Sequence, residues 1–485
     1  MKNAVCVLTL LLTLGSARAD VFYVGPPADY AGEIKAGRLK GSIQDAIDAA
    51  SDGDTIVVQE GTYFENVNFK GKNIVLTSTD PDDPRIVAAT VIDGNQAGCV
   101  ITFAGTEDET CVLAGFTISN GYDTWAGGIC GGTWEVATHA IIRNNMITEN
   151  TLWNGGAVVF CDGLIQNNTV CKTSILCTGA ALCDCQGTIE GNAIVDNPCT
   201  GLVGCSGLVH NNYISGNSTA LANCSGIIQN NTISDNLCEG LGLCNGIIQN
   251  NIVSNNREGI YRGDEAIIRN NVITGNWAGG LIYCHGEIRN NLIAGNSSAL
   301  GGGLSMCGGT IENNTIAHNS ASNGGGFYCC GGTIRNCIIW GNTATEGAQL
   351  YGSSQPSYSC IQDWMEGGEG NIDVDPCFAD VNNGNYHLKS QAGRWDANEG
   401  RWTIDEVTSP CIDAGDPMTP IGPEPFPNGG IINMGAYGGT VEASKSYFDN
   451  PLCEIIVAGD INSDCAVNFL DFRLMALHWL TNNNL

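Results

Sequence analysis

The sequence predicts an all-β solenoid, in which successive coils of one chain stack on each other. The motif Ile-x-Asn-Asn-x-Ile-x-x-Asn returns every 19 to 24 residues between residues 142 and 342, and a fixed period of this length is typical of stacked repeats. Its apolar positions lie too close together for a helical period, and Ile, Val, Thr, Asn and Gly are poor helix formers. The motif also lacks the leucine skeleton of leucine-rich repeats. Coiled β-strands are therefore the predicted building unit.

Two columns of aliphatic residues appear when the ten repeats are aligned on their second asparagine, which is Asn145 in the first repeat. One column lies three residues before this position, from Ile142 to Ile334, and the other lies two residues after it, from Ile147 to Ile339. Every member is Ile or Val, as the stacked inward positions of a parallel sheet require. Five residues after the marker, Asn fills nine of the ten repeats. We expect these asparagines to adopt the left-handed turn conformation and to bond amide to amide between coils, which lie about 4.8 Å apart.

A column of cysteines lies seven residues before the marker. Its members are Cys161, Cys185, Cys205, Cys224, Cys244, Cys284, Cys307 and Cys330, and the column is interrupted at Thr138 and Asp264. Neighbouring coils bring these residues within disulfide range, but their parallel Cβ directions would strain the bond. We therefore predict a ladder of small, buried, mostly free thiols, with vertical disulfides as the alternative. A zinc site is disfavoured because no CxxC pair has a second CxxC at the required spacing.

The N-terminal 98 residues contain two segments that precede the repeats. Residues 1–19 combine a lysine, an apolar run and the small-x-small sequence Ala-Arg-Ala, which predicts a signal peptide cleaved before Asp20. A membrane anchor is the weaker alternative because the apolar run is short for a span. Residues 20–98 are expected to form a cap and the first coils. Ser42 can N-cap a short helix that buries Ile43, Ala46, Ile47 and Ala50 and so closes the open end of the coils.

Several stretches resemble a known architecture. AGFTISNG (114–121) and GGGFYCCGGTI (324–334) look like the coils of right-handed parallel β-helices of the pectate-lyase-like kind. SPCIDAGDP (409–417) and NMGAYGGT (433–440) match the C-terminal trailer that such secreted proteins often carry. The resemblance implies a β-helix over 99–350 and an irregular C-terminal region over 351–445. It is specific for architecture and weak for activity, because this fold hosts lyases, hydrolases, epimerases and adhesins.

The end of the chain contains a candidate calcium loop, followed by an amphipathic helix. Loop positions one, three, five, seven, nine and twelve are Asp460, Asn462, Asp464, Ala466 through its carbonyl, Asn468 and Asp471. The short Asp at position twelve resembles a dockerin half-repeat. Cys465 replaces the usual Gly, and a disulfide to Cys453 could staple this module, which we place at 446–485. The resemblance implies Ca²⁺ as cofactor and a cohesin-like or cell-surface partner, although a complete dockerin has two repeats. A solvated acidic turn is the alternative.

Charged residues are sparse from 100 to 340 except on two neighbouring coils, where they form a candidate catalytic patch. Its members are Arg262, Asp264, Glu265, Arg269, His285, Glu287 and Arg289. Parallel stacking places His285 beside Glu265, Arg289 beside Arg269, and Glu287 beside Ile267. Uronate lyases of this fold use carboxylates to hold calcium against the substrate acid group, and a basic side chain removes the acidified proton. Two or three converging carboxylates would instead suit glycoside hydrolysis. Surface ion pairing alone is the competing explanation.

The net charge of the chain limits the classes of molecule that it can bind. Fifty acidic and twenty basic residues give a net charge of −30, which repels nucleic acid and anionic membranes. It would also repel an acidic polysaccharide unless cations bridge the two, which again points to calcium. Trp125, Trp134, Trp153 and Trp277 are candidate platforms for sugar rings. Because of the predicted signal peptide, and because no later stretch is apolar enough to cross a membrane, we expect a secreted, extracellular or cell-surface protein without a membrane span.

Two functions fit these observations. One is a carbohydrate-active protein that cleaves an acidic glycan by calcium-assisted β-elimination. The other is a non-catalytic glycan-binding protein, adhesin or scaffold, which the regularity of the repeat favours.

Overall fold

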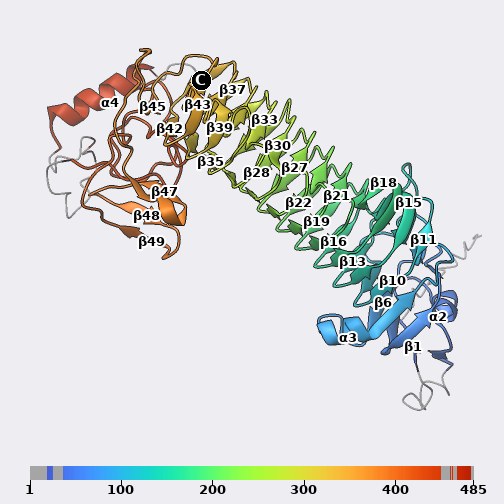
Figure 1. Ribbon diagram of the computed structural model, residues 1–485. Coiled ribbons are helices and arrows are strands. Elements are labelled where there is room, and N and C mark those ends of the chain that lie inside the picture. Colours follow the sequence, from blue (N-terminus) through green and yellow to red (C-terminus); the bar gives the residue numbers. More distant parts are fainter. Residues whose placement is uncertain (1–18, 26–36, 449–458, 460, 462–466, 482–485) are drawn as a thin grey trace, which may run out of the picture.

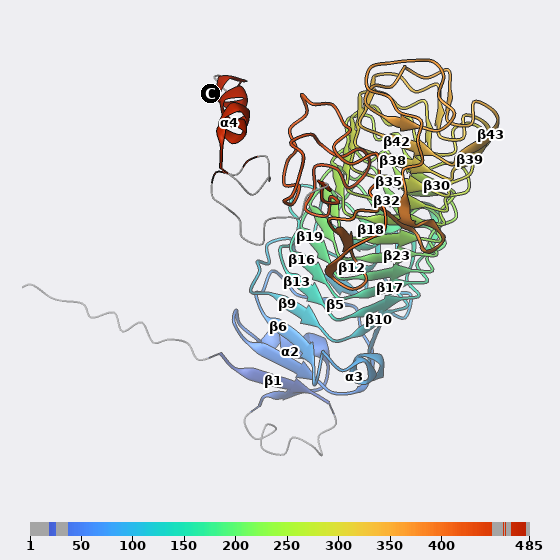
Figure 2. The ribbon, with the colours of Figure 1, turned by 90° about the vertical axis from the view of Figure 1, so that its left-hand side faces the viewer.

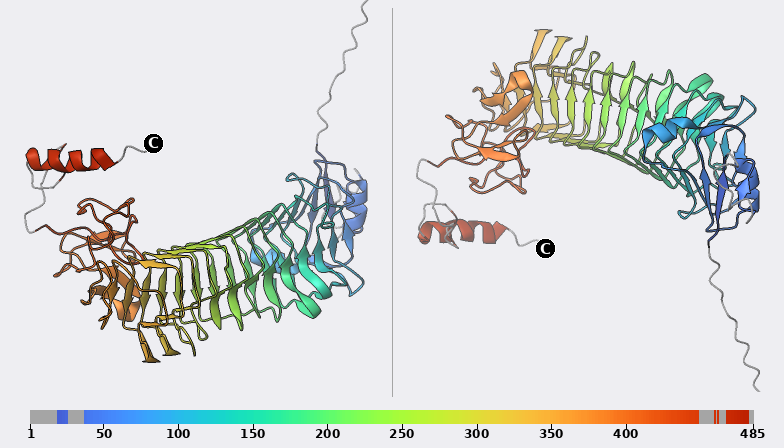
Figure 3. Two further views of the ribbon diagram at one scale, coloured as in Figure 1. Left: turned by 90° about the horizontal axis from the view of Figure 1, so that it is seen from above. Right: turned by 90° about the horizontal axis from the view of Figure 1, so that it is seen from below.

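The computed structural model describes residues 19–25, 37–448, 459, 461 and 467–481. Within them the chain winds into a long parallel β-solenoid with three sheets along its length (Figure 1). Views from above and below show the stacked coils following a gentle curve (Figure 3). No helix in the described ranges is long and apolar enough to span a membrane.

Each of the three sheets takes one strand from successive coils along the solenoid. Sheet A has 15 strands, in the spatial order β2 (Leu39–Lys40), β1 (Val21–Val24), β3 (Thr55–Val58), β6 (Val75–Ser78), β9 (Val112–Ala114), β13 (Ile141–Arg143), β16 (Leu164–Gln166), β19 (Thr188–Glu190), β22 (Leu208–His210), β25 (Ile227–Gln229), β28 (Ile247–Gln249), β31 (Ile267–Arg269), β34 (Glu287–Arg289), β37 (Thr310–Glu312) and β41 (Thr333–Arg335). Sheet B has 14: β4 (Gly61–Phe64), β7 (Thr90–Asp93), β10 (Thr117–Ser119), β14 (Met146–Thr148), β17 (Thr169–Cys171), β20 (Ala193–Val195), β23 (Tyr213–Ser215), β26 (Thr232–Ser234), β29 (Ile252–Ser254), β32 (Val272–Thr274), β35 (Leu292–Ala294), β38 (Thr315–Ala317), β42 (Ile338–Trp340) and β45 (Cys360–Ile361). Sheet C also has 14: β5 (Val67–Asn68), β8 (Ile101–Thr102), β12 (Ala126–Cys130), β15 (Thr151–Val159), β18 (Ser174–Cys183), β21 (Thr200–Val203), β24 (Leu221–Ala222), β27 (Glu239–Gly242), β30 (Glu258–Tyr261), β33 (Leu281–Ile282), β36 (Leu304–Ser305), β40 (Phe327–Tyr328), β44 (Leu350–Tyr351) and, paired with β15 at the side, β11 (Tyr122–Asp123).

The remaining elements are short. Three two-stranded pairs are β39 (Ser320–Asn323) with β43 (Thr343–Glu346), β46 (Phe378–Asp380) with β47 (Asn385–Leu388), and β48 (Arg394–Asp396) with β49 (Arg401–Thr403). The helices are α2 (Ile43–Ala49), α3 (Pro84–Ala89), the 3-10 helix η2 (Val381–Asn383) and α4 (Phe469–Thr481).

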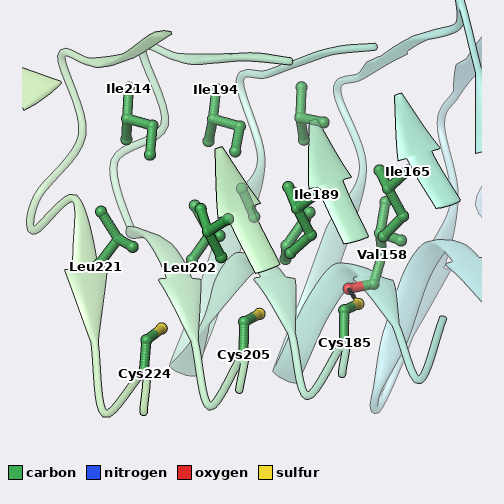
Figure 4. Close-up of a cluster of buried hydrophobic side chains, with 14 of the residues drawn as sticks. Val158, Ile165, Cys185, Ile189, Ile194, Leu202, Cys205, Ile214, Leu221 and Cys224 are labelled. Atoms are coloured by element: carbon green, nitrogen blue, oxygen red, sulfur yellow. Dashed lines mark hydrogen bonds between the residues drawn. The ribbon is translucent and has the colours of Figure 1, made fainter. Parts of the chain in front are cut away.

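The register of the coils confirms the two predicted columns. Ile142 pairs with Ile165 and Ile165 with Ile189 in sheet A, and the second column stacks in the same way in sheet B. Both columns are buried along their whole length. Figure 4 shows Ile165 and Ile189 of one column and Ile194 and Ile214 of the other pointing into the core. Burial of each such side chain contributes about 1.5–3 kcal/mol.

Each coil turns at three corners, and each corner combines a left-handed residue with a buried side chain after it. In one coil the left-handed residues are Asn144 (φ 57°), Glu149 (φ 56°) and Phe160 (φ 55°), and they precede Asn145, Asn150 and Cys161. The amide ladder predicted for the fifth-position asparagines is confirmed, since Asn197 Nδ2 donates to Asn217 Oδ1 at 2.9 Å. The marker asparagines form a second ladder, in which Asn168 Nδ2 donates to Asn192 Oδ1 at 3.1 Å. The prediction that the fifth-position asparagines are themselves left-handed is wrong. The preceding residue adopts that conformation, because Asn150 must point inward to donate to the Ile118 carbonyl.

The cysteine column forms the third corner ladder. All 21 cysteines among the described residues are free, which agrees with the predicted thiol ladder, whereas Cys453 and Cys465 lie outside these residues. Each thiol donates to the carbonyl two residues earlier, as Cys205 Sγ does to Val203 O at 3.5 Å. Figure 4 shows Cys185, Cys205 and Cys224 lying on successive coils. Cysteine is therefore a compact core residue that also satisfies a corner carbonyl.

The two breaks in the cysteine column differ. Thr138 is fully buried and forms a parallel β-bridge with Cys161, so it takes the place of a cysteine in the ladder. Asp264 does not occupy the column. Gly263 is the buried residue there, and the Asp264 side chain is 42 % exposed. The corner between Tyr261 and Ile267 contains one residue more than the corresponding corner of the preceding coil, between Gly242 and Ile247. The additional residue displaces Asp264 outward.

The N-terminal end of the solenoid is covered by a helix, and the C-terminal region packs on one side of the later coils. Helix α2 lies at the N-terminal end (Figures 1 and 2) and buries Ile43, Ala46 and Ile47, with the predicted Ser42 cap accepting from Asp45 N at 3.1 Å. Near the other end, the C-terminal region packs Phe378, Tyr386 and other apolar residues against the outer face of sheet B.

Candidate functional site

One small cavity collects much of the predicted chemistry. It occupies about 330 Å³ at the corner between sheets C and A, and its lining is Tyr261, Arg262, Asp264, Tyr283 and His285. We call it the corner cavity. The Nε2 atom of His285 lies 4.0 Å from Asp264 Oδ1. The rings of Tyr261 and Tyr283 lie 6.0 Å apart, edge to face. A guanidinium, a carboxylate, an imidazole and two phenols thus share one cavity.

Local backbone geometry explains how these side chains meet. Arg262 and Tyr283 are the left-handed corner residues of adjacent coils (φ 56° and 55°), and each is followed by a buried residue. A left-handed corner turns its own side chain outward, so both project to solvent. The additional residue in the Arg262 corner carries Asp264 outward as well, where it faces His285 of the next coil.

The other members of the predicted patch lie apart from this cavity. The predicted pairing within the strands is confirmed, because Arg269 pairs with Arg289 and Ile267 with Glu287. The predicted placement of His285 beside Glu265 is wrong, because the additional corner residue brings Asp264 to His285 instead. These positions lie on the outer face of sheet A. Arg269 Nε donates to Gln249 Oε1 at 2.8 Å, and Arg289 Nε lies 2.6 Å from Glu287 Oε1. The predicted patch therefore divides into two groups of residues. One group lines the corner cavity, and the other lies on the outer face of sheet A.

Glu265 is also outside the cavity lining. Its backbone N–H donates to Asn245 Oδ1 at 3.2 Å, and its side chain is exposed. The tyrosines were missed by sequence reasoning, because aromatic residues in a repeat are typical of packing. The useful signal would have been their coil position, since Tyr261 precedes a left-handed corner and Tyr283 occupies one.

A larger groove lies on the outer face of sheet C, towards the N-terminal end. It occupies about 770 Å³, and its lining includes Trp125, Ile175, Thr178, Asp184, Thr200 and Asn223. Strands β15 and β18 are nine and ten residues long, and their extra length builds the wall of this groove. Trp125 is 60 % exposed at its edge, so its ring is available as a platform. We call this the Trp125 groove.

The three other tryptophans lie outside this groove. Trp153 donates to Tyr122 Oη at 3.0 Å, Trp134 is exposed, and Arg257 lies 5.9 Å over the Trp277 ring.

Two stacked carboxylates lie on the two coils that follow the Trp125 groove, and the second of these coils also carries Tyr261 and Arg262 of the corner cavity. Glu239 and Glu258 are register partners on neighbouring strands of sheet C. Thr219 Oγ1 donates to Glu239 Oε2 at 2.8 Å. Burial, and then the charge of Glu239, raise the pKa of Glu258 above its ordinary value. The outer face of sheet C thus carries a succession of polar and aromatic groups along the solenoid axis.

The predicted calcium loop is only partly described. Asp460, Asn462, Asp464 and Ala466 lie outside the described residues. Asp471 is buried, and its two carboxylate oxygens accept from Ile461 N and Asn468 N, each at 2.7 Å. Its carboxylate therefore faces the loop. Within the described ranges, no group of three or more His, Cys, Asp or Glu side chains is placed to hold a metal ion.

Comparison with family models decides the handedness of the coil. The model described as "Right handed beta helix region" matches residues 163–298. The chain is a right-handed parallel β-helix. The predicted fold class is thus confirmed for the coils. A second model, described as "Disaggregatase related", matches residues 257–415, which include the corner cavity of this β-helix. No curated protein matches the sequence.

Several solved structures are similar to the β-helix. The pectate lyase Pel9A is 15 % identical, with 87 % of this chain and 96 % of that chain covered and a TM-score of 0.30. The A-module of the Azotobacter vinelandii mannuronan C-5 epimerase AlgE6 is 17 % identical, with 67 % and 95 % covered and a TM-score of 0.35. The AlgE4 A-module from the same organism is 17 % identical, with 66 % and 94 % covered and a TM-score of 0.32.

Proposed function

We propose that this β-helix binds a polysaccharide along the outer face of sheet C and cleaves an acidic glycan by β-elimination in the corner cavity. The observation that carries the proposal is the shared lining of that cavity by Arg262, Asp264, His285 and two tyrosines. The Trp125 groove and the Glu239–Glu258 pair lie on the same face, so a polymer could extend along it.

The chemistry of β-elimination matches these side chains. A base removes the proton on the carbon beside the uronate carboxyl group, the electron pair forms a carbon–carbon double bond, and the bond to the leaving sugar oxygen breaks. Arg262 can pair with the uronate and stabilise the developing negative charge. His285 is the candidate base, and Asp264 orients its imidazole. A tyrosine hydroxyl, from Tyr261 or Tyr283, can protonate the departing oxygen.

The proposal includes binding of calcium by the C-terminal loop. Its ligands would be Asp460, Asn462, Asp464, the Ala466 carbonyl, Asn468 and Asp471, and the inward-facing carboxylate of Asp471 supports this. Calcium assistance at the glycan is a second part of the proposal, since a chain with a net charge of −30 repels a polyanion. Secretion through residues 1–19 and docking of residues 446–485 to a cohesin-like or cell-surface partner complete it.

A non-catalytic glycan-binding role is the second candidate. It is favoured by the pairing of Arg269 with Gln249 and of Arg289 with Glu287, which leaves these groups engaged with their own neighbours. Such a protein would use the Trp125 groove without turnover.

The ultraviolet absorbance of the unsaturated sugar end separates the two candidates. Full-length protein is mixed with a panel of polyuronates, with calcium and with a chelator. We expect a rise in absorbance on at least one polymer, and a loss of at least 100-fold in His285→Ala and in Arg262→Ala. His210→Ala and Arg143→Ala are matched controls, because these residues lie on the outer face of sheet A, where His210 Nε2 lies 3.8 Å from Glu190 Oε1.

Absence of a rise on every polymer, with binding retained, would assign the non-catalytic role. A rise that survives both corner-cavity variants would place the reaction elsewhere.

A further inference from the structure

A second cavity lies where the C-terminal region packs on the β-helix. It occupies about 390 Å³, within the roughly 300–1,000 Å³ of ligand pockets. We call it the junction cavity. Its lining includes Asn250, Asn270, Val272 and Leu292 from the coils, and His387, Tyr437 and Glu442 from the C-terminal region. It lies at the corner between sheets A and B and is separate from the corner cavity, which lies at the corner between sheets C and A.

The coil side of the junction cavity belongs to a column of left-handed corner asparagines. Three later members of this column hold the C-terminal region. Asn290 Nδ2 donates to the carbonyls of Ala436 and Gly438, at 3.1 and 2.7 Å, and Asn313 Nδ2 donates to that of Asn433 at 2.9 Å. Asn336 Oδ1 accepts from Asp416 N at 2.7 Å.

Asn250 and Asn270 precede these residues in the same column, with φ of 56° and 55°. The two are one coil apart, because Asn250 N donates to Arg269 O of the next coil. Their side-chain amides make no hydrogen bond with another described residue, and they line the cavity instead. They present donors and acceptors where the next three coils already bind backbone oxygens and N–H groups.

The C-terminal side of the cavity is a polar and aromatic wall. The rings of His387 and Tyr437 stack, with centroids 3.6 Å apart. His387 Nε2 lies 3.1 Å from Glu442 Oε2, and its Nδ1 lies 2.9 Å from Asn385 Oδ1. His387 is buried and has both ring nitrogens engaged, so it positions Glu442 and is not free to act as a base. Oε1 of Glu442 remains available, and the Glu442 side chain is 41 % exposed.

Tyr437 adds a neutral hydroxyl. Burial, and then the Glu442 charge, raise the pKa of this phenol above its ordinary value, so it stays protonated. Its hydroxyl forms no hydrogen bond within the described part of the chain. The cavity therefore offers two amides, one carboxylate oxygen and one hydroxyl, beside the apolar surface of Val272 and Leu292.

We propose that the junction cavity is a binding site for a neutral saccharide. A sugar hydroxyl both donates and accepts, so neighbouring hydroxyls can pair with an amide and with a carboxylate. The apolar face of a pyranose suits Val272, Leu292 and the aromatic wall. Anionic ligands are disfavoured, because no Arg or Lys lines the cavity, both ring nitrogens of His387 are engaged with protein oxygens, and the free Oε1 of Glu442 would face the anion. Purely apolar ligands would leave the four polar groups unpaired.

Isothermal titration of the full-length protein tests the proposal. The probes are the methyl glycosides of glucose, galactose, mannose, xylose and N-acetylglucosamine, with galacturonate as the acidic comparison. We expect saturable binding of at least one neutral glycoside, and binding of galacturonate to this cavity at least 10-fold weaker. Asn270→Gly and Glu442→Gln should each weaken the neutral glycoside at least 10-fold.

Asn230→Gly is the matched control, because Asn230 occupies the same left-handed column (φ 55°) away from the cavity. Gly191 already occupies this column at φ 64°, so glycine suits the backbone there. Thermal melting confirms that each variant is folded.

Two results would overturn the proposal. One is no binding of any neutral glycoside by the wild-type chain. The other is binding that persists in Asn270→Gly and Glu442→Gln but is lost in Arg262→Ala, which would assign the sugar to the corner cavity. The titration measures binding and not cleavage, so its result tests this site independently of the proposed lyase activity.

Discussion

At Asn212 a single buried amide shows why the motif repeats. Its Nδ2 donates to Ile189 O at 2.8 Å and to Asn231 Oδ1 at 3.0 Å, and its own Oδ1 accepts from Asn192 N at 2.9 Å. Asparagine is the small side chain that provides donor and acceptor together at this position. A residue that lacks either function leaves buried groups unpaired in two coils.

Replacement of Asn212 by Asp tests this residue-scale argument. The carboxylate keeps the shape of the amide but cannot donate, so in place of Nδ2 it brings a buried charge or a single proton against the oxygens of Ile189, His210 and Asn231. We expect a loss of at least 3 kcal/mol in the free energy of unfolding, since each unsatisfied buried group costs about 1–3 kcal/mol. The measurement is the midpoint of chemical denaturation followed by circular dichroism.

Asn211→Asp is the control for this substitution. Asn211 is the exposed, left-handed neighbour (φ 56°), and Asp235 already adopts the same conformation elsewhere. An equal loss of stability in both variants would contradict the ladder argument.

At the scale of single elements, a buried carboxylate holds part of the C-terminal region in place. In the C-terminal region Glu424 is 7 % exposed, and its Oε1 accepts from Asn433 N and Gly439 N, at 2.8 and 2.7 Å. These bonds hold the NMGAYGGT segment that packs on the coils. Burial outweighs them and raises the pKa of Glu424 from 4.5 to about 7.

Glu424 predicts a pH dependence of stability. Between about pH 4.5 and 7 the folded chain binds a proton at Glu424 that the unfolded chain has released, so stability falls as the pH rises. The full change is about 3 kcal/mol. Glu424→Gln keeps the acceptor without the charge, and we expect a flatter plot of melting temperature against pH, with a higher value near pH 8. Glu366→Gln, at an exposed position in the same region, should leave the slope unchanged. An unchanged slope in Glu424→Gln would contradict the assignment.

The whole molecule behaves as a stack in which each coil is a template for the next. Coils of 20 residues repeat between Gly226 and Gly286 with preserved register, and Ile227 pairs with Ile247. Stability in such a stack is approximately a sum over coils and their interfaces. The proposed polymer binding depends on the number of coils, because the Trp125 groove and the corner cavity lie on the same side of the solenoid at different positions along its axis.

Deletion of one coil tests this modularity. Removal of residues 227–246 joins Gly226 to Ile247, which occupies the position of Ile227. We expect a folded protein with unchanged β-type circular dichroism and a modest loss of stability. The spacing between the Trp125 groove and the corner cavity shortens by about 4.8 Å. Cleavage of long polymers should therefore fall more than cleavage of short ones. Equal effects on both would show that the groove and the cavity do not hold one chain.

Much of the fold could be predicted because its determinants are periodic. The inward columns, the Asn and Cys ladders and the pairing of Arg269 with Arg289 all follow from counting residues in the repeat. The candidate site was less predictable. Counting placed Asp264 in the cysteine column, whereas one additional residue in that corner moves it outward to His285. A local insertion changes where a side chain points without changing the composition of the repeat.

The all-β solenoid, the stacked columns, the Ser42 cap and the residue types available for chemistry can all be read from the sequence. Which of those residues meet depends on the tertiary structure. It separated Glu287 and Arg289 from the corner cavity, since they lie on another face, and it added Tyr261 and Tyr283. It also brought His387, Tyr437 and Glu442 to Asn250 and Asn270, across more than a hundred residues of chain. The reason is physical. Contacts between successive coils follow from the repeat period, whereas contacts between a corner, a sheet face and a distant segment depend on how the irregular parts pack on the coils.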